Sequence, residues 1–270
     1  MLWNAKNGTV PIDDTQMSYV CFGQGPEHFV LLPGLSDGLT TVKGKAVMLA
    51  KTYKPFFERF TVFMFSRKDD LPQGSSIREM AADQAAAMES LGMENACVMG
   101  VSQGGMIAQY LAIDHPHLVK KLVLAVTAPR ANDMIRSAVG AWIELAKKGD
   151  HRQLMIDTAE KSYSEAWLKK YRKYYPLLGH LGKPKDYRRF LTNAEAILDF
   201  DAYDDLDQIS CPALILAGKE DKIVGVKASY DRMEKIEGSR LHVYPGLGHA
   251  AYEEAPDFNE RVLRFLMEQR

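Results

Sequence analysis

The sequence has few cysteines, no long apolar run and almost no net charge. Its three cysteines lie in or beside apolar runs, so we expect buried free thiols and a reducing, cytoplasmic compartment. The apolar stretches are much shorter than the ~20 residues of a membrane span, and no signal peptide precedes them, so we expect no membrane association. A net charge of −1 gives no general attraction for nucleic acid. These absences leave an ordinary globular chain of 270 residues, which suits one large α/β domain or a core with an insertion.

One strand-to-helix transition carries the pattern G-x-S-x-G. Residues 96–99 are typical of a buried strand, and residues 105–112 have the pattern of a helix. Between them lies Gly100–Gly104, with Ser102 at its centre. Glycines on both sides of the serine avoid a collision with neighbouring backbone in a sharp turn. The pattern therefore predicts an exposed serine hydroxyl at the end of a strand, beside the N–H groups of a helix N-terminus.

Strand patterns alternate with helix patterns along most of the chain. Strands are predicted at residues 9–12, 17–22, 29–32, 60–65, 96–99, 122–126, 213–217 and 241–244. Helices are predicted at residues 41–53, 77–91 and 105–112, and from Pro256 onward. Only helical patterns occur between about residues 130 and 205, at 134–147, 152–163, 165–175 and 187–198. We therefore predict an α/β fold with a mostly parallel central sheet and helices on both faces, in which residues 1–129 and 206–270 form the core and residues 130–205 an inserted helical cap.

Two loops that follow predicted strands can supply partners for Ser102. A serine hydroxyl needs an adjacent base to become a nucleophile, and the base needs an orienting acid. The loop after residues 241–244 carries His249, which we predict as the base. The loop after residues 213–217 carries Asp221, which we predict as the acid, with Glu220 and Glu253 as rivals. Because parallel strands end at one edge of the sheet, these side chains should meet there.

The same edge should provide two backbone N–H groups for a developing oxyanion. We predict the amide of Gln103, which follows the serine, and the amide of Leu35, in the loop after residues 29–32. No metal or cofactor is expected. The pair His115 and His117 is the best metal-binding candidate, but it has no evident third ligand.

Together these motifs make the chain resemble serine hydrolases of the α/β-hydrolase fold that carry a helical cap. The resemblance lies in the segments Leu31–Leu35, Gly100–Gly105, Gly218–Asp221, Gly246–His249 and Glu253–Pro256. Many such relatives have His-Gly where this chain has Pro33 and Gly34, which leaves the subfamily open. The resemblance implies that the cap is a lid over the site. It also implies transfer of an acyl group to water through an acyl-enzyme, with small carboxylic esters or lactones as substrates.

Several alternatives remain open at this stage. C–C bond hydrolysis and cofactor-free perhydrolysis use the same three residues, and some proteins of this fold bind ligands without catalysis. A serine at this turn argues against the dehalogenases and epoxide hydrolases of the fold, which use an aspartate there. Trp142 and Trp167 either line an apolar acyl pocket or pack the cap onto the core. Whether the protein is a monomer or a homodimer is left open.

The cap is also unusually basic. Residues 130–192 contain 14 lysines and arginines against 7 aspartates and glutamates. The densest run is residues 169–174, and it is either a solvated helix face or a surface that attracts a carboxylate-bearing substrate or a partner. No nucleic-acid-binding motif accompanies it, so nucleic acid is not expected as a partner.

Overall fold

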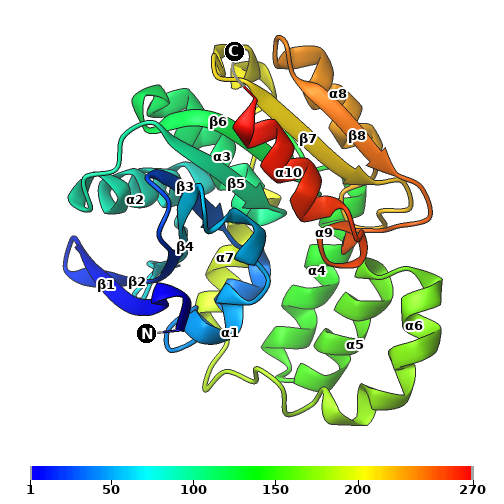
Figure 1. Cartoon of the computed structure of the whole chain (residues 1–270). Helices are drawn as coiled ribbons and strands as arrows, with labels where there is room; N and C mark the ends of the chain where they lie inside the picture. The colour runs from blue at the N-terminus through cyan, green and yellow to red at the C-terminus, as the bar shows by residue number, and fades with distance from the viewer. Residues whose placement is uncertain (1, 269–270) are drawn as a thin grey trace.

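A computed structural model describes residues 2–268, and its centre is an eight-stranded sheet (Figure 1). The strands are β1 (Lys6–Ile12), β2 (Thr15–Gly23), β3 (Glu27–Leu32), β4 (Phe60–Lys68), β5 (Ala96–Val101), β6 (Val119–Ala125), β7 (Ala213–Gly218) and β8 (Arg240–Tyr244). Their order in the sheet is β1-β2-β4-β3-β5-β6-β7-β8. Pairing is antiparallel between β1 and β2 and between β2 and β4, and parallel elsewhere. The predicted α/β fold with a mostly parallel sheet is confirmed.

Helices lie in each connection from β3 onward and in the segment after β8. The α-helices are α1 (Ala46–Ala50), α2 (Ile77–Ser90), α3 (Gln103–Asp114), α4 (Asp133–Lys147), α5 (His151–Ser162), α6 (Glu165–Tyr171), α7 (Arg188–Leu198), α8 (Lys227–Lys235), α9 (Ala251–Glu254) and α10 (Phe258–Met267). Short 3-10 turns add η1 (Leu2–Asn4), η2 (Leu35–Gly38), η3 (Lys54–Phe56), η4 (Pro116–Leu118), η5 (Arg172–Leu177) and η6 (Tyr203–Gln208).

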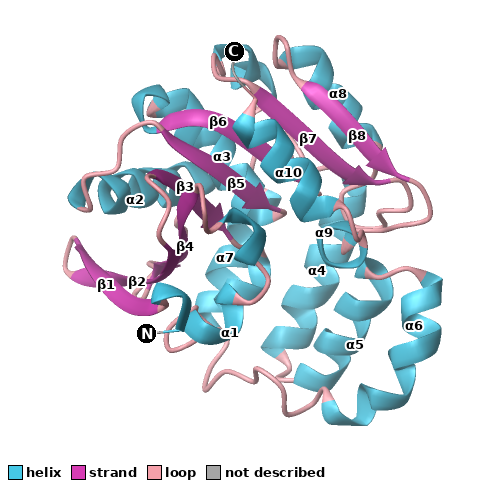
Figure 2. Ribbon diagram, viewed as in Figure 1, coloured by secondary structure: helices cyan, strands magenta, loops and turns pink. Residues whose placement is uncertain are grey.

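Both faces of the sheet are buried, each under its own set of helices. Successive residues of a strand point to opposite faces, so Val98 packs with α2 and α3 while Cys97 and Met99 pack with α1 and α10. Figure 2 shows α10 crossing the sheet on the face opposite α3. This double burial explains why the central strands are apolar throughout rather than alternating.

The segment between β6 and β7 contains the helices α4 to α7. Its two ends are held together, because the Ala131 N–H donates to the Phe200 carbonyl at 2.8 Å and the Ala202 N–H donates to the Pro129 carbonyl at 2.9 Å. In Figure 1, α4, α5 and α6 extend beyond the end of the sheet toward which the strand arrows point. On this basis we propose that residues 130–205 form a cap over that edge, with residues 1–129 and 206–270 as the core.

Three local predictions were wrong in part. The helix expected over 41–53 is reduced to α1, because Gly44 has a φ of +77° and the turns after Ala50 tighten into 3-10 bonding. The last helix begins at Phe258 rather than Pro256, since the short helix α9 and a turn precede it. Only Cys97 is a buried thiol, while Cys21 and Cys211 are half-buried.

Candidate active site

Ser102 lies on a sharp turn between β5 and α3. Its φ of 53° and ψ of −119° are unusual for a residue with a side chain, and such strain concentrates at functional sites. The turn depends on its glycines: a Cβ on Gly100 would lie 2.3 Å from the Gly104 carbonyl oxygen, and a Cβ on Gly104 would lie 1.9 Å from the Leu32 carbonyl oxygen. Only glycine fits at these two positions, so the G-x-S-x-G spacing follows from the backbone geometry.

Ser102, His249 and Asp221 form one chain of hydrogen bonds. The distance from Ser102 Oγ to His249 Nε2 is 2.9 Å, and that from His249 Nδ1 to Asp221 Oδ2 is 2.8 Å. The other carboxylate oxygen, Asp221 Oδ1, accepts the N–H groups of Ile223 at 2.8 Å and Val224 at 3.0 Å. The structure thus brings together the three residues that the sequence predicts, although they come from three separate connections.

The environment favours an ionised Asp221. Burial by itself would raise the pKa of this carboxyl, but His249 and the two backbone N–H donors outweigh it and hold the pKa below its ordinary value. Asp221 is 5% exposed and His249 is 8% exposed, so the pair is largely shielded from water. The rival carboxylates do not take this place, since Glu220 is exposed and Glu253 accepts a hydrogen bond from the Tyr163 hydroxyl at 2.6 Å.

The two predicted amide donors lie on either side of the serine turn. Gln103 is the first residue of α3, so its N–H has no partner within the helix. Leu35 begins η2, directly after Gly34. A Cβ on Gly34 would lie 3.3 Å from the Ser102 Cβ, which places this loop against the serine. Within the described residues, neither amide donates a hydrogen bond to another part of the chain.

The two tryptophans predicted as pocket residues make contacts inside the cap. Trp142 is buried, and its indole N–H donates to Asp157 at 2.7 Å. Trp167 stacks between Tyr163 and Tyr171, with ring centroids 3.7 Å and 4.3 Å away. These contacts account for packing of the cap, and a role for either tryptophan in binding substrate stays a prediction.

The basic run of the cap is engaged with neighbouring side chains on the surface. Arg172 forms ion pairs with Glu160 at 2.8 Å and Glu165 at 2.6 Å. The ammonium group of Lys170 lies 5.1 Å from the centre of the Tyr171 ring. These contacts favour the interpretation of the run as a solvated helix face.

No group of three or more metal-ligating side chains is found in residues 2–268. His117 is one of the two histidines considered as ligands, and its Nε2 atom lies 3.3 Å from Glu89 Oε1. Across the same described residues, none of the helices has the length and apolar character needed to span a bilayer.

Sequence reasoning missed a cluster of charged residues next to the site. Asp37, Arg67 and Arg189 come from η2, β4 and α7 and are joined by hydrogen bonds, and Arg67 also donates to Gln103, the residue after the serine. Asp37 is 2% exposed, and a carboxylate buried this deeply needs charged or hydrogen-bonding partners. The sequence offered one weak signal, an aspartate within the loop that was predicted to supply an oxyanion donor.

The arrangement of an elbow serine, a histidine and an aspartate at the edge of this sheet defines the α/β-hydrolase class. A family model described as alpha/beta hydrolase fold matches residues 28–256, and the chain belongs to that family. The resemblance inferred from the sequence is thereby confirmed.

Known relatives are enzymes of several activities. A fluoroacetate dehalogenase from a Burkholderia species is 27% identical over 299 aligned residues, covering 97% of this chain and 93% of that protein. The 2-hydroxy-6-oxononadienedioate/2-hydroxy-6-oxononatrienedioate hydrolase 2 of Pseudomonas putida is 27% identical over 271 residues, covering 94% of this chain and 92% of that protein. The crystal structure of an enol-lactonase from Burkholderia xenovorans LB400 superposes with a TM-score of 0.81 at 19% identity, over 97% of this chain and 100% of the other.

These matches show that the chain is an enzyme of the α/β-hydrolase family, and the named relatives act on small molecules. The names of the relatives differ in the bond that is cleaved. Membership of the family therefore leaves the reaction to be argued from the site.

Proposed function

We propose that this protein hydrolyses small carboxylic esters or lactones through an acyl-enzyme. The observation that supports the proposal best is the continuous hydrogen-bond chain from Ser102 Oγ through His249 to Asp221. A serine at the elbow is a nucleophile suited to acyl transfer, and the histidine lies at the distance required of its general base.

Acylation forms one bond, breaks one bond and moves one proton from Ser102 to the leaving oxygen through His249. Ser102 Oγ attacks the acyl carbon while His249 Nε2 takes the hydroxyl proton, and the carbonyl electron pair moves onto oxygen. When the carbonyl re-forms, the bond to the leaving oxygen breaks and His249 returns the proton to that oxygen. Asp221, hydrogen-bonded to Nδ1, keeps Nε2 free to accept a proton and stabilises the imidazolium.

Deacylation repeats these steps with water as the nucleophile. His249 takes a proton from water, the hydroxide attacks the acyl carbon, and collapse of the intermediate returns the proton to Ser102. The products are a carboxylic acid and an alcohol, or a hydroxy acid when the substrate is a lactone. In both halves the amides of Gln103 and Leu35 donate to the oxyanion, and the N-terminal end of α3 adds a favourable dipole.

A fluorophosphonate probe tests whether Ser102 is activated. The probe should add once to the wild-type protein, as read by intact mass, and should not add to Ser102→Ala. Ser90→Ala, which changes an exposed serine at the end of α2, is the matched control and should be labelled like wild type. A wild-type protein that stays unlabelled, or label that persists on Ser102→Ala, would contradict the proposal.

Hydrolysis of a carbon–carbon bond is a second candidate. It is favoured by the Pseudomonas putida relative, whose name describes hydrolysis of a 2-hydroxy-6-oxo dienedioate. A panel of phenyl esters, lactones and a dienol ketone separates the two candidates. Turnover of the ketone with a negligible rate on the esters would support the second candidate over the first.

We also propose a cytoplasmic location. The thiols of Cys21 and Cys97 are free, and burial raises the pKa of the Cys97 thiol to about 12, which keeps it protonated and unreactive. A fusion to a fluorescent protein, followed by fractionation of the cells, tests this. Recovery of the fusion outside the cytoplasm would contradict it.

A further inference from the structure

A buried polar cluster connects both oxyanion-donor segments to the cap. Its members are Asp37, Arg67, Gln103, Arg189 and Asn193. Asp37 lies two residues after the Leu35 amide, and Gln103 carries the other predicted donor. Arg67 comes from β4, and Arg189 and Asn193 come from the cap helix α7, Asn193 taking part through its backbone carbonyl.

Asp37 holds the Leu35 side of the cluster. Its Oδ2 accepts hydrogen bonds from the Arg67 backbone N–H at 3.0 Å and from Arg189 Nη2 at 2.8 Å. A third donor group, Arg67 Nη1, lies 3.6 Å from the same oxygen. Burial would raise the pKa of this carboxyl, but Arg189 and Arg67 outweigh burial and hold the pKa below its ordinary value. Asp37 is therefore a buried anion held by two guanidinium groups.

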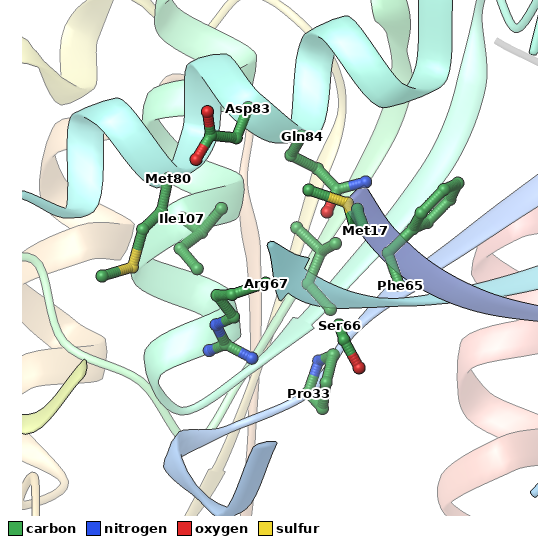
Figure 3. A pocket seen from close by; sticks show the side chains of 10 residues that line it. Met17, Pro33, Phe65, Ser66, Arg67, Met80, Asp83, Gln84 and Ile107 are labelled. Carbon is green, nitrogen blue, oxygen red and sulfur yellow. The ribbon is translucent and has the colours of Figure 1, made fainter. Parts of the chain in front are cut away.

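Arg67 and Asn193 hold the Gln103 side. Arg67 Nη2 donates to Gln103 Oε1 at 2.8 Å, and Gln103 Nε2 donates to the Asn193 carbonyl at 2.7 Å. Gln103 is fully buried, so its amide has no water to replace these partners. Figure 3 shows Arg67 together with Pro33 and Ser66, which line the same pocket. One arginine thus touches both segments.

Arg189 connects the cluster to the cap. It lies in the first turn of α7, and its Nη1 donates to the Asp37 carbonyl oxygen while Nη2 donates to the Arg67 carbonyl at 2.9 Å. In the next turn of α7, the Asn193 carbonyl accepts the hydrogen bond from the Gln103 side chain. A displacement of α7 would therefore disturb both segments together.

We propose that Arg67 and Arg189 are positioning residues that set the spacing between the Gln103 and Leu35 amides. In this arrangement α7 is part of the oxyanion-binding structure, and the cap does more than cover the site. The inference rests on the proposed function, because it assigns the two amides to the oxyanion of acyl transfer. Hydrogen-bond donors that are already in position before the reaction stabilise the transition state, and a shift of about 1 Å in their position can lower the rate roughly 100-fold.

Arg189→Met is the main test, because Arg189 lies at the edge of the cluster with its side chain 17% exposed. We expect kcat on a phenyl ester to fall about 10- to 100-fold with KM changed less than about twofold. The inhibition constant of a phenylboronic acid, which forms a tetrahedral adduct with the serine, should rise by the same factor as kcat/KM falls. Arg188→Ala is the matched control: this neighbouring side chain is exposed and pairs only with Asp186 among the described residues, so all three constants should stay as in wild type.

Arg189→Gln provides a second variant if Arg189→Met does not fold. It keeps one N–H donor toward Asp37, and its kcat should lie between those of Arg189→Met and wild type. Thermal unfolding defines a temperature at which each variant is folded for the assays. A folded variant with unchanged kcat/KM and unchanged boronate inhibition would overturn the inference, and so would a rise in KM alone.

Labelling with the fluorophosphonate separates this inference from the proposed function. If wild type is not labelled on Ser102, the proposed function fails. If wild type is labelled and both Arg189 variants react at the wild-type rate, the proposed function stands and the positioning role of the arginines fails. The expected result is normal labelling of wild type and of Arg188→Ala, with labelling of Arg189→Met slowed in proportion to its loss of kcat/KM.

Discussion

Replacing Asp221 by asparagine should remove most of the activity while leaving the fold intact. Asp221 Oδ1 accepts the N–H groups of Ile223 and Val224, and an asparagine amide oxygen can accept both bonds in the same place. The amide nitrogen must then take the place of Oδ2 and face His249 Nδ1 at 2.8 Å. Because this nitrogen is a donor, Nδ1 becomes the acceptor and the ring proton moves to Nε2, which can no longer accept the proton of Ser102.

The size of the effect follows from the loss of the general base. A wrong histidine tautomer in a serine–histidine–aspartate site costs about 10⁴ in kcat, which corresponds to roughly 5 kcal/mol in the activation barrier. Stability should change far less, because the two backbone N–H groups keep an acceptor. Asp221→Ala would leave both buried N–H groups unpaired, which would lower the free energy of unfolding by about 1–3 kcal/mol for each group. It is the less informative variant, because it changes stability together with activity.

Steady-state hydrolysis of a p-nitrophenyl ester measures the effect, with thermal unfolding as the check on folding. Glu220→Gln is the control, since it removes the same charge from the neighbouring exposed residue, and its kcat should stay within about twofold of wild type. If folded Asp221→Asn kept more than about a tenth of the wild-type kcat, the orientation argument would be refuted.

Three further predictions concern folding and stability. Gly104→Ala places a Cβ 1.9 Å from the Leu32 carbonyl oxygen, so we expect the free energy of unfolding to fall by about 1–3 kcal/mol or more, as in an overpacked core. A thermal midpoint equal to that of wild type would contradict the elbow geometry. Asp37→Asn should be less stable than wild type above about pH 4, and the difference in free energy of urea unfolding should shrink at lower pH. The reason is that the buried carboxyl has a lowered pKa, so its stabilising effect is lost as it is protonated. A difference that stays constant from pH 7 to pH 3 would refute this. Glu254 joins the core to the cap, because one of its carboxylate oxygens accepts the Ser164 N–H at 2.9 Å. Glu254→Gln should lower the free energy of unfolding in denaturant by about 1 kcal/mol, and an unchanged denaturation midpoint would contradict this.

The sequence alone determined the features that depend on local pattern. Glycine spacing around Ser102 identified the elbow, because the turn excludes any Cβ at those two positions. The first turn of α2 is equally local: Ser76 and Glu79, three residues apart in the sequence, form a capping box. The meeting of Ser102, Asp221 and His249 also followed from the sequence, because the loops that follow parallel strands lie at one edge of the sheet.

Only the tertiary structure decided which polar groups meet in the interior. The sequence favoured Asp221 but kept Glu220 as a rival, and the structure separates the two: the Asp221 carboxylate turns inward to His249, while Glu220 is exposed. The cluster of Asp37, Arg67 and Arg189 could not be foreseen, because its members lie far apart in the chain and a lone charged residue in a sequence is usually a solvated one. Burial reverses that expectation: once the cap and the sheet enclose these side chains, each charge must find its partner within the protein, and the fold alone sets which partners are in reach.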